Sequence, residues 1–173
     1  MQPDLMTERL LLRKFHLDDA TEVQKLAGNE NVSKMTLNIP YPYEAGVAEE
    51  WIRSHQENWE ARVRITYAIV KLDTLQLLGT IGFVRIEGSE GEIGYWIGEP
   101  YWGMGYCTEA ARELIRFSFQ NLGLDRIIAE HLTLNPASGK VMEKVGMKHL
   151  MTTQRIDRYG KNASMEVYEI QNT

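Results

Sequence analysis

Short runs of β-branched and aromatic residues along the chain predict the strands of a sheet. These runs cover residues 9–15, 65–71, 77–86, 92–97, 126–132, 148–153 and 165–170. The three runs between residues 65 and 97 are separated only by short turns, with Asp73 in the first and Gly88 in the second. This part of the chain is therefore predicted to form an antiparallel meander.

Other segments carry apolar residues at intervals of three or four, which predicts helices. The predicted helices cover residues 19–27, 44–60, 106–122 and 136–145. Asp18 is predicted to cap the first helix, and His55 to pack within the apolar stripe of the second. Residues 29–43 have no clear period and carry proline and large apolar side chains, and we expect this loop to line a cleft.

The order of these elements predicts a single α/β (α+β) domain over residues 1–173. We expect a mixed, mostly antiparallel, twisted sheet with helices on both faces. Its centre is a β-α-β crossover, from strand 92–97 through helix 106–122 to strand 126–132.

Composition and charge exclude several classes of partner. The formal net charge is −5 and no basic cluster is present, which opposes direct binding of nucleic acid. No apolar run approaches the ~20 residues of a membrane span, and the N-terminus lacks the features of a secretory signal. Cys107 is the only cysteine, which excludes an intramolecular disulfide. We therefore expect a cytoplasmic protein that acts without a membrane or nucleic acid.

Two glycines, Gly103 and Gly105, precede the predicted helix 106–122. Glycine lets the backbone turn tightly with no Cβ atom in its path, so successive N–H groups can point at one anion. The start of a helix adds unpaired N–H groups and about half a positive charge. This segment therefore favours binding of a phosphate or pyrophosphate group, although a plain turn between a strand and a helix can have the same residues.

Two common phosphate-binding motifs fit this segment poorly. A P-loop requires Lys followed by Ser or Thr after its last glycine, where this chain has Tyr106, Cys107 and Thr108. A dinucleotide-binding fingerprint requires glycine at the position of Thr108, although Asp125 lies at a suitable spacing for a ribose contact. Dinucleotide binding stays open as an alternative.

Residues 102–107 resemble the acetyl-CoA pyrophosphate loop of the GNAT N-acetyltransferase superfamily, whose pattern is Gln/Arg-x-x-Gly-x-Gly/Ala. Gly105 matches the central glycine, whereas Trp102 replaces the Gln or Arg and Cys107 replaces the last small residue. The run Trp-Gly-x-Gly-Tyr-x-Thr-Glu-Ala at residues 102–110 is the form found in the Rim-type branch, which resembles ribosomal-protein N-terminal acetyltransferases.

Two further segments are similar to the same branch. The opening Thr7-Glu8-Arg9-Leu10 is similar to its first motif, and residues 135–147 are similar to its pattern Asn-x-x-Ser-x-x-Val-x-Glu-Lys-x-Gly-Phe. Within the second segment, Gly139 replaces the usual Asn or Arg and Met147 replaces the aromatic residue. The resemblance implies a GNAT-like fold, acetyl-CoA as co-substrate and, as in many members, a homodimer.

The resemblance also implies which residues bind acetyl-CoA. Backbone groups of Tyr95, Trp96 and Ile97 are expected to pair with pantetheine where this strand separates from its neighbour. Asn135 contacts the pantetheine arm and also suits a helix N-cap. Ser138 is expected near the CoA sulfur, where it protonates the departing thiolate, unless it only satisfies a local N–H. The pyrophosphate is expected at the loop amides of Gly103, Met104, Gly105, Tyr106, Cys107 and Thr108.

Transfer of an acetyl group to an amine requires a neutral amine, a polarised carbonyl and a proton for the sulfur. The N–H groups of residues 95–97 are candidates to hold the thioester oxygen. Glu92 and Glu130 flank the expected strand separation, and either is a candidate to accept the amine proton. The alternative is that both are solvated strand ends. Tyr168 is a further candidate contributor.

The sequence predicts neither a nucleophilic cysteine nor a metal site. Cys107 lies at a helix start, which favours the thiolate, but neither motif contains a histidine to activate it. We therefore expect Cys107 to be a small loop residue. The histidines show no ligand spacing, so no metal is expected.

The resemblance implies an acyltransferase enzyme that N-acetylates a primary amine, with a protein N-terminal α-amine as the first acceptor to consider. Two alternatives stay open. The same branch contains enzymes that act on small amines and antibiotics, and a non-catalytic acyl-CoA-binding module would keep the same glycine segment.

Overall fold

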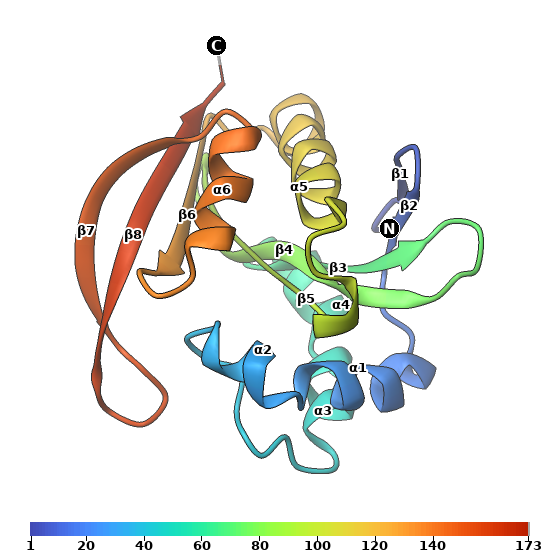
Figure 1. Ribbon diagram of the computed structural model, residues 1–173. Helices are drawn as coiled ribbons and strands as arrows, with labels where there is room; N and C mark the ends of the chain where they lie inside the picture. Colours follow the sequence, from blue (N-terminus) through green and yellow to red (C-terminus); the bar gives the residue numbers. More distant parts are fainter. Residues whose placement is uncertain (173) are drawn as a thin grey trace.

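The computed structural model describes residues 1–172 and contains an 8-stranded mixed sheet in the order β1-β2-β3-β4-β5-β6-β8-β7 (Figure 1). Neighbouring strands run antiparallel except for β5 and β6, which are parallel. The strands are β1 (Leu5–Met6), β2 (Leu10–Arg13), β3 (Ile65–Lys71), β4 (Leu77–Glu87), β5 (Glu90–Ile97), β6 (Arg126–Leu132), β7 (Lys148–Ile156) and β8 (Asn162–Gln171).

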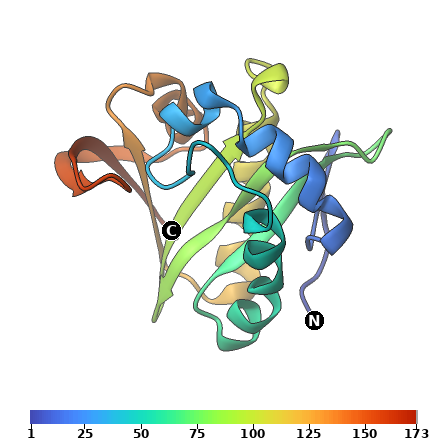
Figure 2. The ribbon, with the colours of Figure 1, turned by 90° about the horizontal axis from the view of Figure 1, so that it is seen from below.

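Helices cover both faces of this sheet, as Figures 1 and 2 show. The helices are α1 (Ala20–Ala27), α2 (Glu30–Lys34), α3 (Val47–Arg53), α4 (His55–Ala61), α5 (Tyr106–Phe117) and α6 (Pro136–Lys144). A π-helical turn, Ser118–Leu122, extends α5. Helices α5 and α6 lie on one face, and α1 and α3 pack on the other. The predicted fold class is therefore confirmed.

Strand β3 is apolar along most of its length because both of its faces are buried. Tyr67 and Ile69 pack into the cluster beneath α5, whereas Ala68 and Val70 belong to the cluster formed with α1 and α3. Alternation along the strand thus connects the two layers of the core.

Several predicted boundaries differ from the structure. The predicted helix 44–60 is two helices, α3 and α4, which meet at Ser54, where the Ser54 hydroxyl donates to the Trp51 carbonyl at 2.7 Å. Residues 29–43 include a short helix, α2, whose N-terminus is capped by Asn29. Asp18 is not a cap. The carboxylate of Asp19 accepts the His16 N–H at 2.8 Å instead. The predictions also missed β1 and made β7 and β8 too short.

The parallel strands β5 and β6 stay together for only half of their length. Residues Glu90 to Ile93 pair with Arg126 to Ala129, and beyond these residues the two strands separate. This is the separation that the family resemblance implied. The crossover helix α5 starts above the open end of β5 and packs back on the sheet, and α6 follows β6 on the same face. Within residues 1–172, no helix is both long and apolar enough to span a membrane.

Candidate active site

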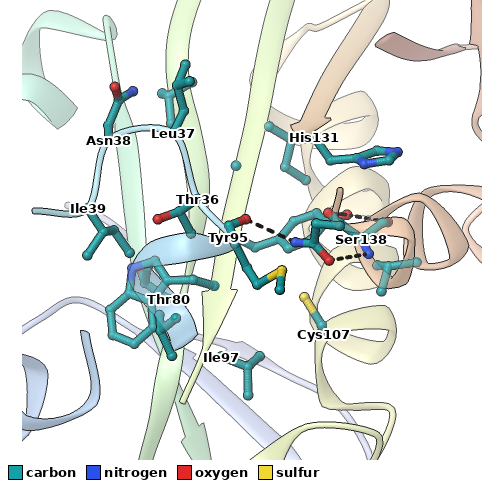
Figure 3. A pocket seen from close by; sticks show the side chains of 18 of the residues that line it. Thr36, Leu37, Asn38, Ile39, Thr80, Tyr95, Ile97, Cys107, His131 and Ser138 are labelled. Atoms are coloured by element: carbon teal, nitrogen blue, oxygen red, sulfur yellow. Dashed lines mark hydrogen bonds between the residues drawn. The ribbon is translucent and has the colours of Figure 1, made fainter. Parts of the chain in front are cut away.

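A cavity of about 1200 Å³ opens where β5 and β6 separate (Figure 3). The end of β5, the start of α5, the end of β6 and the start of α6 form one part of its wall. The loop between α2 and α3 and the middle of β4 form the other part. Every predicted site residue lines this cavity except Met104 and Tyr168.

The glycine segment has the conformation that only glycine adopts readily. Gly103 has a φ of 75° and Gly105 a φ of 79°, both in the left-handed region. The first hydrogen bond of α5 runs from the Glu109 N–H to the Gly105 carbonyl at 3.1 Å. The amides of the first helical turn therefore have no partner within the helix. These donors and the helix dipole make this end of the cavity suited to an anion.

Along the open edge of β5, the backbone N–H and C=O groups of successive residues point alternately toward β4 and toward the cavity. The Gly98 N–H bonds to the Leu78 carbonyl in β4 at 2.8 Å, and the Ile97 carbonyl accepts the Trp102 indole N–H at 2.7 Å. Since backbone groups of successive residues point to opposite sides of a strand, Tyr95 and Ile97 face the opening. The backbone of Trp96 faces β4. Only two of the three predicted backbone positions therefore present groups to the cavity, and Trp102 already occupies one of their carbonyls.

Two hydroxyl groups meet where β5 approaches α6 (Figure 3). The Ser138 hydroxyl donates to the Tyr95 oxygen at 3.1 Å, and the Tyr95 hydroxyl donates to the Ser138 carbonyl at 3.0 Å. Burial raises the pKa of the Tyr95 hydroxyl, so this group keeps its proton. The predictions used only the backbone of Tyr95, and the structure adds its side chain to the site.

Asn135 is the N-cap of α6, as its sequence position predicts. Its side-chain oxygen accepts the Ser138 N–H at 3.3 Å, and its amide nitrogen donates to the Met35 carbonyl at 3.0 Å. Both ends of the amide therefore have protein partners, and the second bond ties the start of α6 to the end of α2.

The two candidate carboxylates differ in how firmly they are paired. Glu130 has a side chain that is only 12% exposed, and both of its oxygens accept hydrogen bonds from Arg155. Glu92 lines the cavity, and only its Oε2 contacts Arg85, at 3.4 Å. Glu92 is therefore the less firmly paired of the two carboxylates. Tyr168 lies apart from both, with its hydroxyl 3.4 Å from Glu143.

The sequence profile described as Acetyltransferase (GNAT) domain matches residues 9–148. This chain belongs to the GNAT acetyltransferase family. It is 32% identical over 146 residues to the uncharacterized N-acetyltransferase p20 of Bacillus licheniformis, covering 83% of this chain and 82% of that one. It is 30% identical over 173 residues to the uncharacterized N-acetyltransferase YoaA of Bacillus subtilis strain 168, covering 98% and 97%. The protein is therefore an acyltransferase enzyme.

Solved structures agree with this assignment. A GNAT-family acetyltransferase of Bacillus anthracis is 26% identical, with a TM-score of 0.85 over 98% of each chain. Two others share the fold at lower identity. The microcin self immunity acetyltransferase MccE, in complex with acetyl-CoA and AMP, has a TM-score of 0.86 at 18% identity over 96% of this chain and 94% of its own. The ribosomal alpha-N-protein acetyltransferase RimL, in complex with coenzyme A, has a TM-score of 0.86 at 16% identity over 98% of each.

The single cysteine of this GNAT enzyme lines the cavity but lacks the environment of a nucleophile. Burial raises the pKa of the Cys107 thiol, which opposes the effect of the helix start. His131, which also lines the cavity, has its Nδ1 2.8 Å from the Leu132 carbonyl. Its Nε2 faces Gly139, where a Cβ atom would come within 2.7 Å. Among residues 1–172, no group of three or more His, Cys, Asp or Glu side chains is placed to hold a metal ion.

Part of the loop 29–43 lines the GNAT cavity, as predicted, but sequence reasoning missed the contacts that hold this loop in place. Arg158, in the turn between β7 and β8, donates to the Ser33 Oγ at 2.6 Å and to the Leu37 carbonyl at 3.0 Å. The Tyr159 hydroxyl donates to the Tyr41 carbonyl at 3.2 Å. These contacts fasten the loop after α2 to the distant hairpin, and no local pattern in the sequence announces them.

Proposed function

We propose that this enzyme transfers the acetyl group of acetyl-CoA to a primary amine. The observation that carries the proposal is the separation of β5 from β6 directly beside the free amides of α5, within one continuous cavity. An extended, anionic acyl donor needs both features: a strand edge for its arm and a donor-rich turn for its pyrophosphate. The acetyl-CoA in the MccE complex supports the choice of donor.

The residues present fit this donor. We place the pyrophosphate at the amides of Gly103 and of residues 105–108, where the left-handed glycines leave space for close approach. The pantetheine arm follows the open edge of β5 and bonds to the backbone of Tyr95 and to the N–H of Ile97, since Trp102 holds the Ile97 carbonyl. Asn135 already has two protein partners, so it shapes the channel through its contact with Met35.

The chemistry is direct attack. The neutral amine attacks the thioester carbon, a C–N bond forms, and the C–S bond breaks to release coenzyme A. Backbone N–H groups on the open edge of β5 stabilise the charge on the thioester oxygen. Glu92 accepts the proton that the amine loses, directly or through water, and Glu130 is the second candidate base. We assign the proton for the departing sulfur to the Tyr95–Ser138 pair, whose hydroxyl oxygens lie 3.1 Å apart at the cavity wall.

We further propose a protein N-terminal α-amine as the acceptor. The support is the similarity of the three sequence motifs to the Rim-type branch, together with the shared fold of RimL. The second half of the cavity runs along the loop after α2, whose apolar side chains suit the first residues of a peptide, and they include Met35, Leu37 and Ile39. We also propose that the enzyme is a homodimer, which light scattering of the purified enzyme tests.

Coenzyme A release in the presence of acetyl-CoA tests this function. The acceptor panel contains peptides with free N-termini, the same peptides with blocked N-termini, and small amines. Release that requires a free peptide N-terminus supports the full proposal. Release with small amines alone would retain the acetyltransferase and replace the acceptor. Tight acetyl-CoA binding without release for any acceptor would identify a non-catalytic binding module.

A further inference from the structure

The carboxylate of Glu109, in the first turn of α5, accepts hydrogen bonds from the turn between β1 and β2. The Thr7 hydroxyl donates to the Glu109 Oε1 at 2.6 Å, and the Arg9 backbone N–H donates to the same oxygen at 2.9 Å. The Arg9 Nε donates to the Glu109 Oε2 at 2.7 Å. Two motifs that lie about a hundred residues apart in sequence, the N-terminal one and the glycine segment, are thus joined at Glu109.

The same arginine also holds the glycine segment itself. The Arg9 Nη1 donates to the Met104 carbonyl at 3.1 Å, and its guanidinium lies over the Tyr106 ring, 4.7 Å from the centroid. Met104 stands between the two left-handed glycines, Gly103 and Gly105. Glycines at these positions leave the segment free to adopt several conformations. The contacts of Arg9 therefore restrict the conformation of a segment whose own backbone is only weakly restricted.

Peptide geometry gives this contact a consequence for the cavity. In a planar trans peptide the C=O and N–H bonds point in opposite directions. When Arg9 holds the Met104 carbonyl, the Gly105 N–H is turned away from Arg9. Gly105 lines the large cavity and Arg9 does not. The bond to Arg9 thus fixes the orientation of an amide at the anion-binding end of the cavity.

We propose that Arg9, locked in place by Glu109 and Thr7, is a positioning residue that presets the glycine segment for the pyrophosphate of the acyl donor. The inference rests on the proposed function. It assigns a role to the N-terminal motif, which lies outside the cavity.

Direct binding of the phosphate by the Arg9 charge is the competing explanation. The geometry opposes it, because the carboxylate of Glu109 lies 2.7 Å from Arg9 and balances its charge. The two explanations predict opposite changes in coenzyme A affinity for Glu109→Gln. If Arg9 positions the segment, losing the carboxylate loosens it and weakens coenzyme A binding. If Arg9 acts by charge, the same change frees its charge and strengthens binding to a polyanion.

The test is calorimetric titration of coenzyme A into the wild type, Arg9→Met, Arg9→Lys, Glu109→Gln and Arg116→Met. The last variant is the control, because Arg116 forms a similar exposed ion pair with Glu113 on the same helix, away from the cavity. We expect Arg9→Met to weaken binding about tenfold, which is 1.4 kcal/mol. Arg9→Lys and Glu109→Gln should weaken it less, and Arg116→Met should leave it unchanged. The kcat at saturating acetyl-CoA should stay near the wild-type value.

Hydrogen exchange without ligand supplies a second measurement that does not depend on activity. Amides of residues 102–108 should exchange faster in Arg9→Met and at the wild-type rate in Arg116→Met. Coenzyme A binding that survives Arg9→Met, or that strengthens in Glu109→Gln, would overturn the inference and leave the proposed function intact. A wild type that binds no coenzyme A would instead overturn the proposed function and the inference with it.

Discussion

The Tyr95 and Ser138 oxygens lie 3.1 Å apart and join β5 to the first turn of α6, at a level where β5 has already lost its pairing with β6. A parallel strand pair that opens must satisfy its edges in some other way. Here a side-chain contact across the opening holds β5 and α6 at a fixed separation while the strand edge between them stays free. The contact therefore shapes the wall of the cavity.

Loss of the Tyr95 hydroxyl should slow the reaction more than it weakens binding. We expect Tyr95→Phe to lower kcat about 100-fold, the lower range for loss of a general acid, with little change in the KM for acetyl-CoA. Ser138→Ala should cost less, because Tyr95 keeps its own proton. Initial rates of coenzyme A release measure both. Ser89→Ala, in the exposed turn before β5, is the matched control, and an unchanged kcat in Tyr95→Phe would remove this tyrosine from the mechanism.

His55 should make the folded state sensitive to mild acid. Its ring packs edge-on against Trp51, both ring nitrogens are buried without a partner, and burial lowers its pKa to about 4 from the usual 6.5. Below pH 6.5 His55 binds a proton in the unfolded chain, whereas in the folded chain it does so only below about pH 4. The free energy of unfolding should therefore fall by up to about 1.4 kcal/mol per pH unit over this window.

Urea unfolding at pH 7.5, 6.0 and 5.0 measures this slope. We expect His55→Phe, which keeps an aromatic ring against Trp51, to flatten the dependence, and the exposed His16→Gln to leave it as in the wild type. An equal slope in the wild type and His55→Phe would assign the acid sensitivity to other groups.

Arg158 should affect the binding of the acceptor and not the binding of the acyl donor. Its guanidinium holds the carbonyls and hydroxyl at the end of α2, where the loop along the second half of the cavity begins. We expect Arg158→Ala to raise the acceptor KM about tenfold, the loss of a few charge-assisted hydrogen bonds, while acetyl-CoA affinity stays unchanged. Lys161→Ala in the same hairpin turn is the control. Equal loss of acetyl-CoA affinity would show that the loop and the donor site are one unit.

Local pattern predicted the elements whose residues carry their own signal. The apolar run of β3 is visible in the sequence because burial on both faces requires apolar residues, and a left-handed φ likewise favours glycine. The glycine segment was found for the same reason. Its assignment to acetyl-CoA came from the family resemblance, since glycines alone also fit a plain turn.

Contacts between distant segments had no such signal. Helix α2 has only five residues, and its distant partners are Glu99, Asn135 and Arg158. Glu99 accepts hydrogen bonds from Asn29 and Asn31, while Asn135 and Arg158 donate to backbone carbonyls of α2 and its C-cap. None of these partners lies near α2 in sequence, so its helical state could not be predicted from residues 29–43. The pairing of Arg9 with Glu109 and of Tyr95 with Ser138 was missed for the same physical reason.

Calorimetric titration of acetyl-CoA into the wild type, Gly105→Val and Gly123→Val tests the central claim most directly, with NADH as a parallel ligand. Both glycines have left-handed φ values, 79° and 71°, so valine strains the backbone equally, but only Gly105 lines the cavity. We expect tight acetyl-CoA binding to the wild type and Gly123→Val, at least tenfold weaker binding to Gly105→Val, and no NADH binding. A wild-type enzyme that does not bind acetyl-CoA, or that binds NADH in its place, would contradict the assignment of this cavity to an acyl-CoA donor.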